Sequence, residues 1–136
     1  MNEAELLFTH LLDCQRQELY LNKHALLDAP QGIFIASVLK RRLRGEPMQY
    51  ILGKTDFMGL ELKLTPDVFI PRPETEIVAE TAIEMVRKFA SSQVRKLKLL
   101  DVGTGSGCIA IAMAKANIEA TIDAIDISHE ALSVAQ

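Results

Sequence analysis

The chain of 136 residues is poor in the residues that mark several classes of protein: it has two cysteines, three histidines, no tryptophan and only 5% aromatic residues. Cys14 and Cys108 are far apart and lack the spacing of metal ligands, so the sequence implies neither a disulfide framework nor a zinc site. A buried free thiol is expected at each. The histidines have no neighbours that would complete a catalytic or metal cluster.

Long hydrophobic runs and an excess of cations are also missing. No apolar run approaches the ~18 residues of a membrane span, and the N-terminus lacks a basic segment followed by an apolar core. We therefore expect a cytoplasmic protein that does not enter a membrane. The net charge of -3 gives no global attraction for nucleic acid, and a hydrophobic content of 49% favours a globular fold.

The most informative segment is residues 99–111, LLDVGTGSGCIAI, which joins an apolar strand to an apolar helix. Gly103, Gly105 and Gly107 occupy alternate positions between them. Glycine is needed where the chain turns tightly or where a ligand lies against the main chain. The helix expected over residues 106–116 points its unpaired amides at this loop, which favours a polar or anionic ligand group.

The glycine spacing distinguishes between nucleotide classes. A dinucleotide fingerprint would need a glycine at Cys108, and a phosphate-binding loop would need Gly-Lys-Ser/Thr at the end of the loop. The remaining pattern, G-x-G-x-G after a strand that ends at the acidic Asp101, resembles motif I of the class I S-adenosylmethionine-dependent methyltransferases. A carboxylate suits a sulfonium cofactor better than it suits a pyrophosphate. A tight turn without a ligand is the alternative.

A second strand is expected at residues 121–125, and Asp126 follows it about 20 residues after the loop. Doubly wound folds place at this position the acid that binds the ribose hydroxyls. Asp126 could instead cap its own loop. Ser128 is predicted to be the N-cap of a helix that begins at His129.

The N-terminal part has helical periodicity. Spaced leucines predict a helix over residues 2–13, and shorter patterns predict helices over 15–23 and 31–45, with a break at 28–30 and Gly45 as a C-cap. The third helix ends in four cations: Lys40, Arg41, Arg42 and Arg44. They form either a solvated basic face or a docking surface for an acidic partner.

From Met48 to Ile70 the spacing of the apolar residues is no longer helical. Alternating apolar residues predict short strands at 50–52, 55–58 and 60–64, with turns at Gly53 and Gly59, and therefore a small antiparallel hairpin.

Pro73 is well placed as the first residue of a helix that runs to about Ala90. Glu74 and Glu76 in its first turn either serve the helix dipole or lie near an active site. The expected buried stripe of this helix consists of Val78, Ala82, Met85, Val86 and Phe89.

Three segments together resemble one family. Residues 44–53 (RGEPMQYILG), residues 69–76 (FIPRPETE) and the glycine loop occur in this order in the PrmC/HemK-type glutamine N5-methyltransferases. The resemblance implies an α/β fold in three parts: a helical substrate-recognition domain over 1–46, a β-hairpin linker over 47–72, and the start of a truncated, Rossmann-like S-adenosylmethionine-binding domain over 73–136.

The resemblance also implies the activity, which is methylation of the glutamine side-chain amide in the Gly-Gly-Gln loop of peptide chain release factors, with S-adenosylmethionine as donor. The implied partners are therefore release factors, with no membrane and no direct nucleic acid. The implied cofactor-binding residues are Gly103, Thr104, Gly105, Ser106, Gly107 and Asp126. Other residues are implied to lie next to the pocket: Phe69, Arg72, Glu74 and Asp101.

Members of this family are longer, and their substrate-reading Asn-Pro-Pro-Tyr segment is absent here, so no catalytic residue and no metal ligand is assigned. We expect the 136-residue chain alone to transfer no methyl group. We also expect exposed apolar strand edges, which could lead to self-association. A fragment of a DNA adenine amino-methyltransferase and a non-enzymatic partner-binding module are the alternatives.

Overall fold

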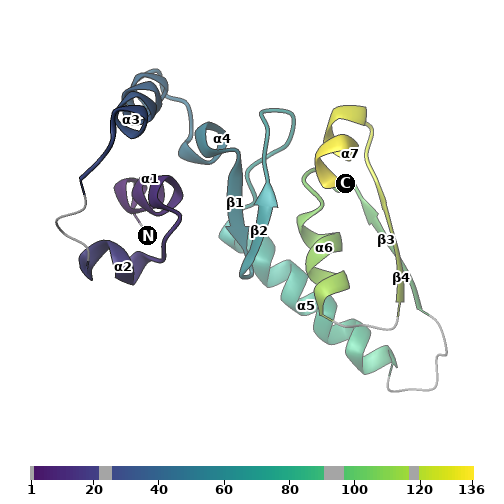
Figure 1. Cartoon of the computed structure of the whole chain (residues 1–136). Coiled ribbons are helices and arrows are strands. Elements are labelled where there is room, and N and C mark those ends of the chain that lie inside the picture. The colour runs from purple at the N-terminus through teal and green to yellow at the C-terminus, as the bar shows by residue number, and fades with distance from the viewer. Residues whose placement is uncertain (1, 22–25, 91–96, 117–119) are drawn as a thin grey trace. The chain divides into compact units, whose positions relative to one another are not determined.

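The computed structural model describes residues 2–21, 26–90, 97–116 and 120–136. The chain packs as two compact units, Met1–Leu52 and Gly53–Gln136, which we call the N-terminal and C-terminal units (Figure 1). The finer division at residues 46/47 and 72/73 stays a prediction. Among the described residues, no helix is both long and apolar enough to span a membrane.

The N-terminal unit is helical, as predicted. Asn2 and Asp28 each begin a helix with a reciprocal capping box, in which the cap side chain accepts from the third residue's amide and that residue's side chain accepts from the cap amide. Its helices are α1 (Glu3–Leu12), α2 (Arg16–Leu21), α3 (Ala29–Arg42) and α4 (Met48–Leu52).

Two details of α3 differ from the prediction. The helix begins at Ala29 rather than at residue 31, because Asp28 caps it and Pro30 occupies the first turn, where a missing amide N–H costs nothing. Its C-cap is Leu43 rather than Gly45. The predicted helix over 15–23 is observed as α2, and the end of that range lies outside the described residues.

The predicted strand at 50–52 is wrong, because these residues belong to α4. The carbonyl of Pro47 accepts the amides of Tyr50 and Ile51, both at 3.1 Å. Met48 and Ile51 are three residues apart, so a helix turns both to one side, and both are buried. A three-residue apolar run is too short to distinguish a strand from a helix.

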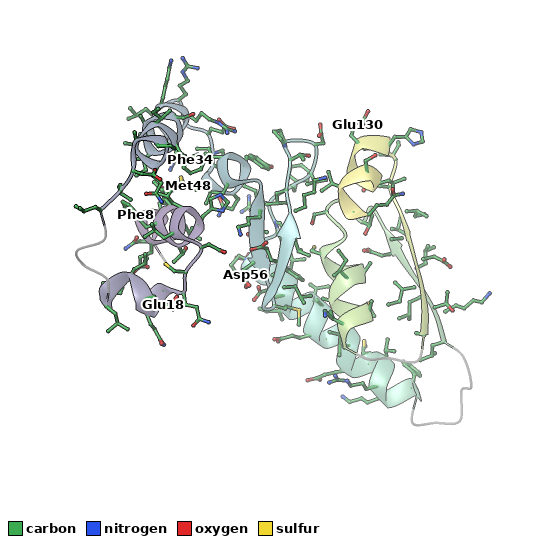
Figure 2. All side chains as sticks on the ribbon, viewed as in Figure 1. Phe8, Glu18, Phe34, Met48, Asp56 and Glu130 are labelled. Atoms are coloured by element: carbon green, nitrogen blue, oxygen red, sulfur yellow. The ribbon has the colours of Figure 1, made fainter. Side chains whose placement is uncertain are left out.

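The core of the N-terminal unit combines α1, α3 and α4 through Leu7, Val38, Met48 and Ile51. Phe34 packs against this core, and Figure 2 labels both Phe34 and Met48.

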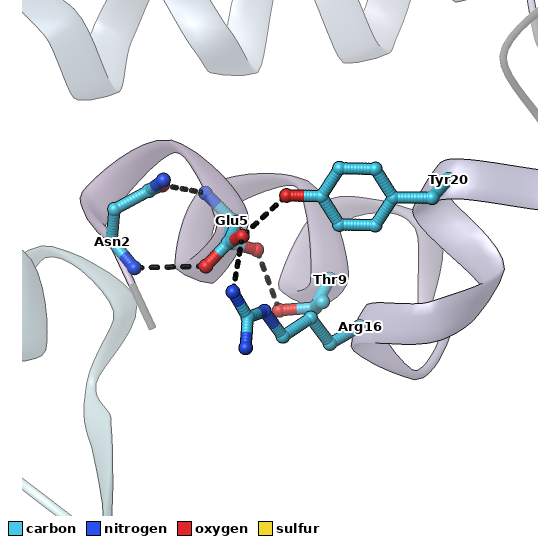
Figure 3. Close-up of polar contacts among 5 residues, drawn as sticks. All are labelled: Asn2, Glu5, Thr9, Arg16 and Tyr20. Carbon is cyan, nitrogen blue, oxygen red and sulfur yellow. Dashed lines mark hydrogen bonds and ion pairs between the residues drawn. The ribbon is translucent and has the colours of Figure 1, made fainter.

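A buried carboxylate joins α1 to α2. Glu5 accepts hydrogen bonds from the Tyr20 hydroxyl, from the amide of Asn2 (2.9 Å) and from the Arg16 guanidinium (2.9 Å), as Figure 3 shows. Together these donors, with Tyr20 contributing most, lower the pKa of Glu5 from 4.5 to about 2. The short helix α2 is therefore held by this charged cluster, since none of its own residues is buried.

The C-terminal unit confirms the α/β prediction. An antiparallel hairpin precedes a long helix, and then two parallel strands alternate with helices. Its elements are β1 (Lys54–Phe57), β2 (Leu60–Lys63), α5 (Pro73–Ala90), β3 (Leu97–Val102), α6 (Cys108–Lys115), β4 (Ala120–Ile125) and α7 (His129–Ala135).

The predicted buried stripe of α5 is mostly wrong. The buried residues are Ala79, Ile83 and Val86, which pack with the hairpin, α6 and the sheet. Of the predicted residues, Val86 is buried and Ala82 is half-buried against this core. Periodicity identifies apolar residues on a helix but not which of two adjacent apolar rows faces the core. The other row is exposed: Val78, Met85 and Phe89.

The sheet of β3 and β4 has one covered face. Leu97, Leu99 and Ile122 pack against the core built by α5 and α6, whereas Leu100, Val102 and Ile125 point to the other face and are exposed. The prediction concerned exposed apolar strand edges, whereas these exposed residues lie on one face of the sheet. Self-association through them stays a prediction.

Acid should weaken the N-terminal unit through Glu5. Because its pKa is depressed in the folded state, its contribution to stability is present above its ordinary pKa of 4.5 and is lost as the pH falls through about 2. We expect Glu5→Gln to lower the thermal unfolding midpoint at neutral pH, as measured by circular dichroism. In acid the wild type loses the stability that Glu5 contributes, so the difference between the two midpoints should shrink. Glu80→Gln, an exposed acid on α5, is the control, and an equal effect of both substitutions at neutral pH would contradict the account.

Candidate functional site

The glycine loop, residues 103–107, lies where β3 and β4 end side by side. Val102 pairs with Ile125 at the carboxyl ends of the two parallel strands. The carbonyl of Ile125 then accepts the amides of Gly103 (2.8 Å) and Thr104 (3.0 Å). The first turn of the loop is therefore attached to the neighbouring strand.

Asp126 joins the two loops that follow the strands. Its Oδ2 accepts the amide N–H of Gly105 (2.8 Å), and its Oδ1 accepts that of Ser128 (3.0 Å). These backbone donors, Ser128 first and Gly105 next, lower the pKa of Asp126, so the carboxylate is ionised at neutral pH. The bond to Ser128 corresponds to the predicted loop cap. The bond to Gly105, 21 residues away, was not predicted.

The three glycines serve two purposes. All have positive φ: 75° at Gly103, 55° at Gly105 and 78° at Gly107. A Cβ added at Gly103 or Gly105 would meet nothing within 4 Å, whereas one at Gly107 would lie 3.1 Å from Ala135 Cβ and 3.2 Å from Ile111 Cδ1. Gly107 therefore permits close packing of α7, and the first two glycines leave the backbone open to a ligand.

The N-terminus of α6 adds electrostatic potential to this open backbone. Its N-cap is Gly107, which has no side chain to cap the first turn. Uncapped amides and the positive end of the helix dipole favour a carboxylate or another anionic group. The amides of Gly103, Gly105 and Gly107 already donate within the protein, so the positive end of the α6 dipole is the feature that favours an anionic ligand group here.

Thr104 and Ser106 are only 5% exposed, although both were predicted to contact the cofactor. The Thr104 hydroxyl donates to Asp101 Oδ2 at 2.7 Å. That hydroxyl is committed to holding the end of β3 against the loop, so any ligand contact at Thr104 would come from its backbone. Burial also raises the pKa of the Cys108 thiol, which keeps that thiol protonated beside the loop, as expected for a buried free thiol.

Phe69, Arg72 and Glu74 lie in or just before the first turn of α5 and are exposed, Phe69 to 93%. Within the described residues, no hydrogen bond or ion pair joins Arg72 or Glu74 to the glycine loop. Their predicted place next to the pocket stays a prediction. The described part of the chain also contains no cluster of three His, Cys, Asp or Glu side chains that could hold a metal ion.

The sequence left two roles open for Glu76, one at the helix dipole and one near an active site. The structure shows a further role. Its Oε1 accepts the amide of Met58 (3.0 Å) at the hairpin turn, where Met58 has φ 52°. Glu76 therefore fastens the hairpin to α5. The positive φ of Met58 is visible only in the structure, so no signal in the sequence indicated this contact.

A cavity of about 350 Å³ lies between the hairpin, α5 and the C-terminal end of α6. Its lining includes Met58, Ile83 and Lys115. The glycine loop precedes the opposite end of α6, so this cavity is no part of the glycine site.

The geometry first defines a class. Parallel strands that end at one edge, a glycine loop that leads into a helix, and an acid after the second strand are features of doubly wound nucleotide-binding proteins. Within this class, the G-x-G-x-G spacing resembles that of the class I methyltransferases.

Comparison with known proteins agrees with that class. A family model described as "PrmC N-terminal domain" matches residues 1–53, and one described as "Methyltransferase small domain" matches residues 76–136. The chain is similar to the release factor glutamine methyltransferases of Coxiella burnetii (42% identity), Koribacter versatilis (43%) and Chlorobaculum tepidum (41%). Each alignment covers 98% of this chain and 47%, 46% and 45% of these relatives, respectively.

The chain thus matches a PrmC N-terminal domain followed by a methyltransferase small domain, and it is similar over 98% of its length to release factor glutamine methyltransferases. It spans about half the length of the curated relatives it matches.

The two purposes of the glycines can be separated by mutation. Gly103→Ala and Gly107→Ala start from φ values of 75° and 78°, so both incur the same left-handed strain of ~1–2 kcal/mol. Only Gly107→Ala adds close contacts, which cost ~1–3 kcal/mol more. Urea denaturation should therefore show the larger loss for Gly107→Ala, and equal losses would contradict the assignment.

The support given by Thr104 is also testable. Thr104→Val removes the donor to Asp101 and should lower the free energy of unfolding by ~1.5–3 kcal/mol, whereas Thr104→Ser keeps the hydroxyl and most of the stability. Thr121→Val on the exposed side of β4 is the matched control, with an expected change within ~0.5 kcal/mol. Chemical denaturation measures all three, and a Thr104→Val variant as stable as Thr104→Ser would argue against this role.

Proposed function

We propose that this chain binds S-adenosylmethionine at the glycine loop, in a protein that methylates the side-chain amide of the glutamine in the Gly-Gly-Gln loop of peptide chain release factors. The observation that carries the proposal is the open backbone at Gly103 and Gly105 beside the ionised carboxylate of Asp126. The names of the relatives support the substrate.

The residues present fit the cofactor. Asp126 uses one lone pair of each oxygen for a backbone amide, so each oxygen can accept a further hydrogen bond from the ribose diol. The uncapped first turn of α6 suits the carboxylate of the methionine part. Asp101 lies near the end of β3, the strand next to the one that Asp126 follows. Its carboxylate suits the positive amino group of the methionine part. When bound, S-adenosylmethionine supplies the methyl group.

The substrate requires positioning more than acid or base strength. A glutamine amide nitrogen is a poor nucleophile because its lone pair is delocalised into the carbonyl group, so the enzyme must orient it toward the donor. In this proposal the glycine loop holds the cofactor end of that arrangement. No described residue is assigned to hold the amide.

Asp126 should carry ribose recognition. Isothermal titration calorimetry with S-adenosylmethionine should show binding by the wild-type chain and at least about tenfold weaker binding by Asp126→Ala, because a hydrogen bond to a charged group contributes ~1.5–3 kcal/mol. Asp123→Asn, which changes an exposed acid of β4, is the control and should bind as the wild type does.

A second titration separates ligand contact from loop support. The wild type should prefer 5′-methylthioadenosine over its 2′,3′-dideoxy analogue, and Asp126→Ala should lose that preference. Absence of S-adenosylmethionine binding by wild-type protein that is folded by circular dichroism would contradict the proposal. An unchanged diol preference in Asp126→Ala would assign Asp126 to loop support alone.

A further inference from the structure

Asp101 carries one carboxylate oxygen that the protein itself does not use. Its Oδ2 accepts the Thr104 hydroxyl at 2.7 Å, whereas its Oδ1 forms no hydrogen bond or ion pair with any residue that the structure describes. Among the described residues, the only fully buried side-chain nitrogen or oxygen without a hydrogen-bond partner is His10 Nδ1. Asp101 Oδ1 is therefore not fully buried, and it is open to solvent or to a ligand.

The other carboxylate of the site is held differently. Both oxygens of Asp126 accept backbone amides, from Gly105 and from Ser128. Asp101 is held at one oxygen only, and by a side chain. A carboxylate with one fixed and one open oxygen can accept a hydrogen bond from a ligand without giving up the contact that orients it.

Thr104 is fixed by its main chain as well as by its side chain. Its amide donates to the Ile125 carbonyl (3.0 Å), and its carbonyl accepts the Gly107 amide (2.8 Å). Because the residue is also only 5% exposed, its hydroxyl stays in one place and restricts rotation of the Asp101 carboxylate. A group that binds a ligand keeps its geometry when packing and hydrogen bonds immobilise the residues that support it.

An open carboxylate oxygen without a cationic partner favours a donor that carries positive charge. The methionine part of the proposed cofactor has an ammonium group and a sulfonium group. Only the ammonium has N–H bonds to donate, and hydrogen bonds between charged groups are the stronger ones. The positive end of the α6 dipole attracts the carboxylate of the same methionine part, so Asp101 and α6 attract opposite charges of one ligand.

We propose that Thr104 is a positioning residue for the cofactor: its hydroxyl holds Asp101 Oδ2, so that Oδ1 receives the ammonium of S-adenosylmethionine. This inference rests on the proposed function, because it presupposes that the glycine loop binds this cofactor. A Thr104 with a structural role alone would stabilise the loop without changing which cofactor analogue the protein prefers.

A pair of ligands isolates the contribution of the ammonium: S-adenosylhomocysteine, and its analogue in which hydrogen replaces the amino group. In isothermal titration calorimetry, the wild-type chain should prefer S-adenosylhomocysteine by about tenfold or more, since the lost contact is a hydrogen bond between charged groups. Thr104→Val and Asp101→Asn should each reduce this preference to about threefold or less, with the affinity for the deaminated analogue unchanged. Thr104→Ser keeps the hydroxyl and should keep the preference.

A double variant shows whether Thr104 acts through Asp101. In the Asp101→Asn background, Thr104→Val should change the preference no further, since residues that act as a unit have non-additive effects. Thr81→Val is the matched control, because it removes a threonine hydroxyl that donates to the Ile77 carbonyl on α5, also at 2.7 Å. It should preserve both affinities and their ratio.

Circular dichroism checks that every variant is folded during the titration. If Thr104→Val does not fold, Thr104→Ala removes the same hydroxyl without placing a second methyl group beside the carboxylate. An unchanged preference in Asp101→Asn would overturn the inference whether or not the Thr104 variants fold.

A wild-type preference in folded Thr104→Val would also overturn the inference, as would an equal loss of affinity for both ligands. Equal binding of both ligands by the wild type would contradict it while leaving cofactor binding at the glycine loop supported. If the folded wild type binds neither ligand, the proposed function is contradicted together with the inference that rests on it.

Discussion

The C-terminal unit depends on one carboxylate, that of Asp126, which connects two loops that the chain itself separates by 21 residues. Parallel pairing of β3 with β4 brings both loops to the same edge. The hydrogen bond from the Gly105 amide to this carboxylate then fixes the middle of the glycine loop. Because backbone amides satisfy the carboxylate, it stays charged at the edge where a ligand with hydroxyl and amino groups would lie.

Other contacts keep that edge in place. Thr104 ties the loop back to the end of β3 through Asp101, and Gly107 lets α7 approach the start of α6. On the covered side of the sheet, α5 packs its row of Ala79, Ile83 and Val86, and Glu76 holds the hairpin turn to it. These few polar and packing contacts hold the loop in place. The side of the loop that we propose faces the ligand consists of backbone alone.

The order of elements and the position of the glycine loop could be predicted from the sequence, because strand, glycines and helix follow one another within 13 residues and the signal is local. The choice of buried row on α5 could not, since Val78, Met85 and Phe89 have the same helical spacing as the true core residues. The segment at 50–52 was mistaken for a strand because its fate depends on Pro47 and on burial of Met48, which are tertiary facts. At the site, the family resemblance implied a ligand contact for Thr104, whereas its buried hydroxyl donates to Asp101.

The central claim is that the glycine loop is the cofactor site and that its open backbone makes the contact. Two-dimensional ¹H–¹⁵N correlation spectra of the 136-residue chain during titration with S-adenosylmethionine test it most directly. The account predicts saturable shifts at the amides of Gly103, Gly105 and Cys108 and at residues next to Asp126, with little change in the helices of the N-terminal unit. Shifts confined to the cavity between the hairpin, α5 and α6, or no shifts in a folded protein, would contradict it.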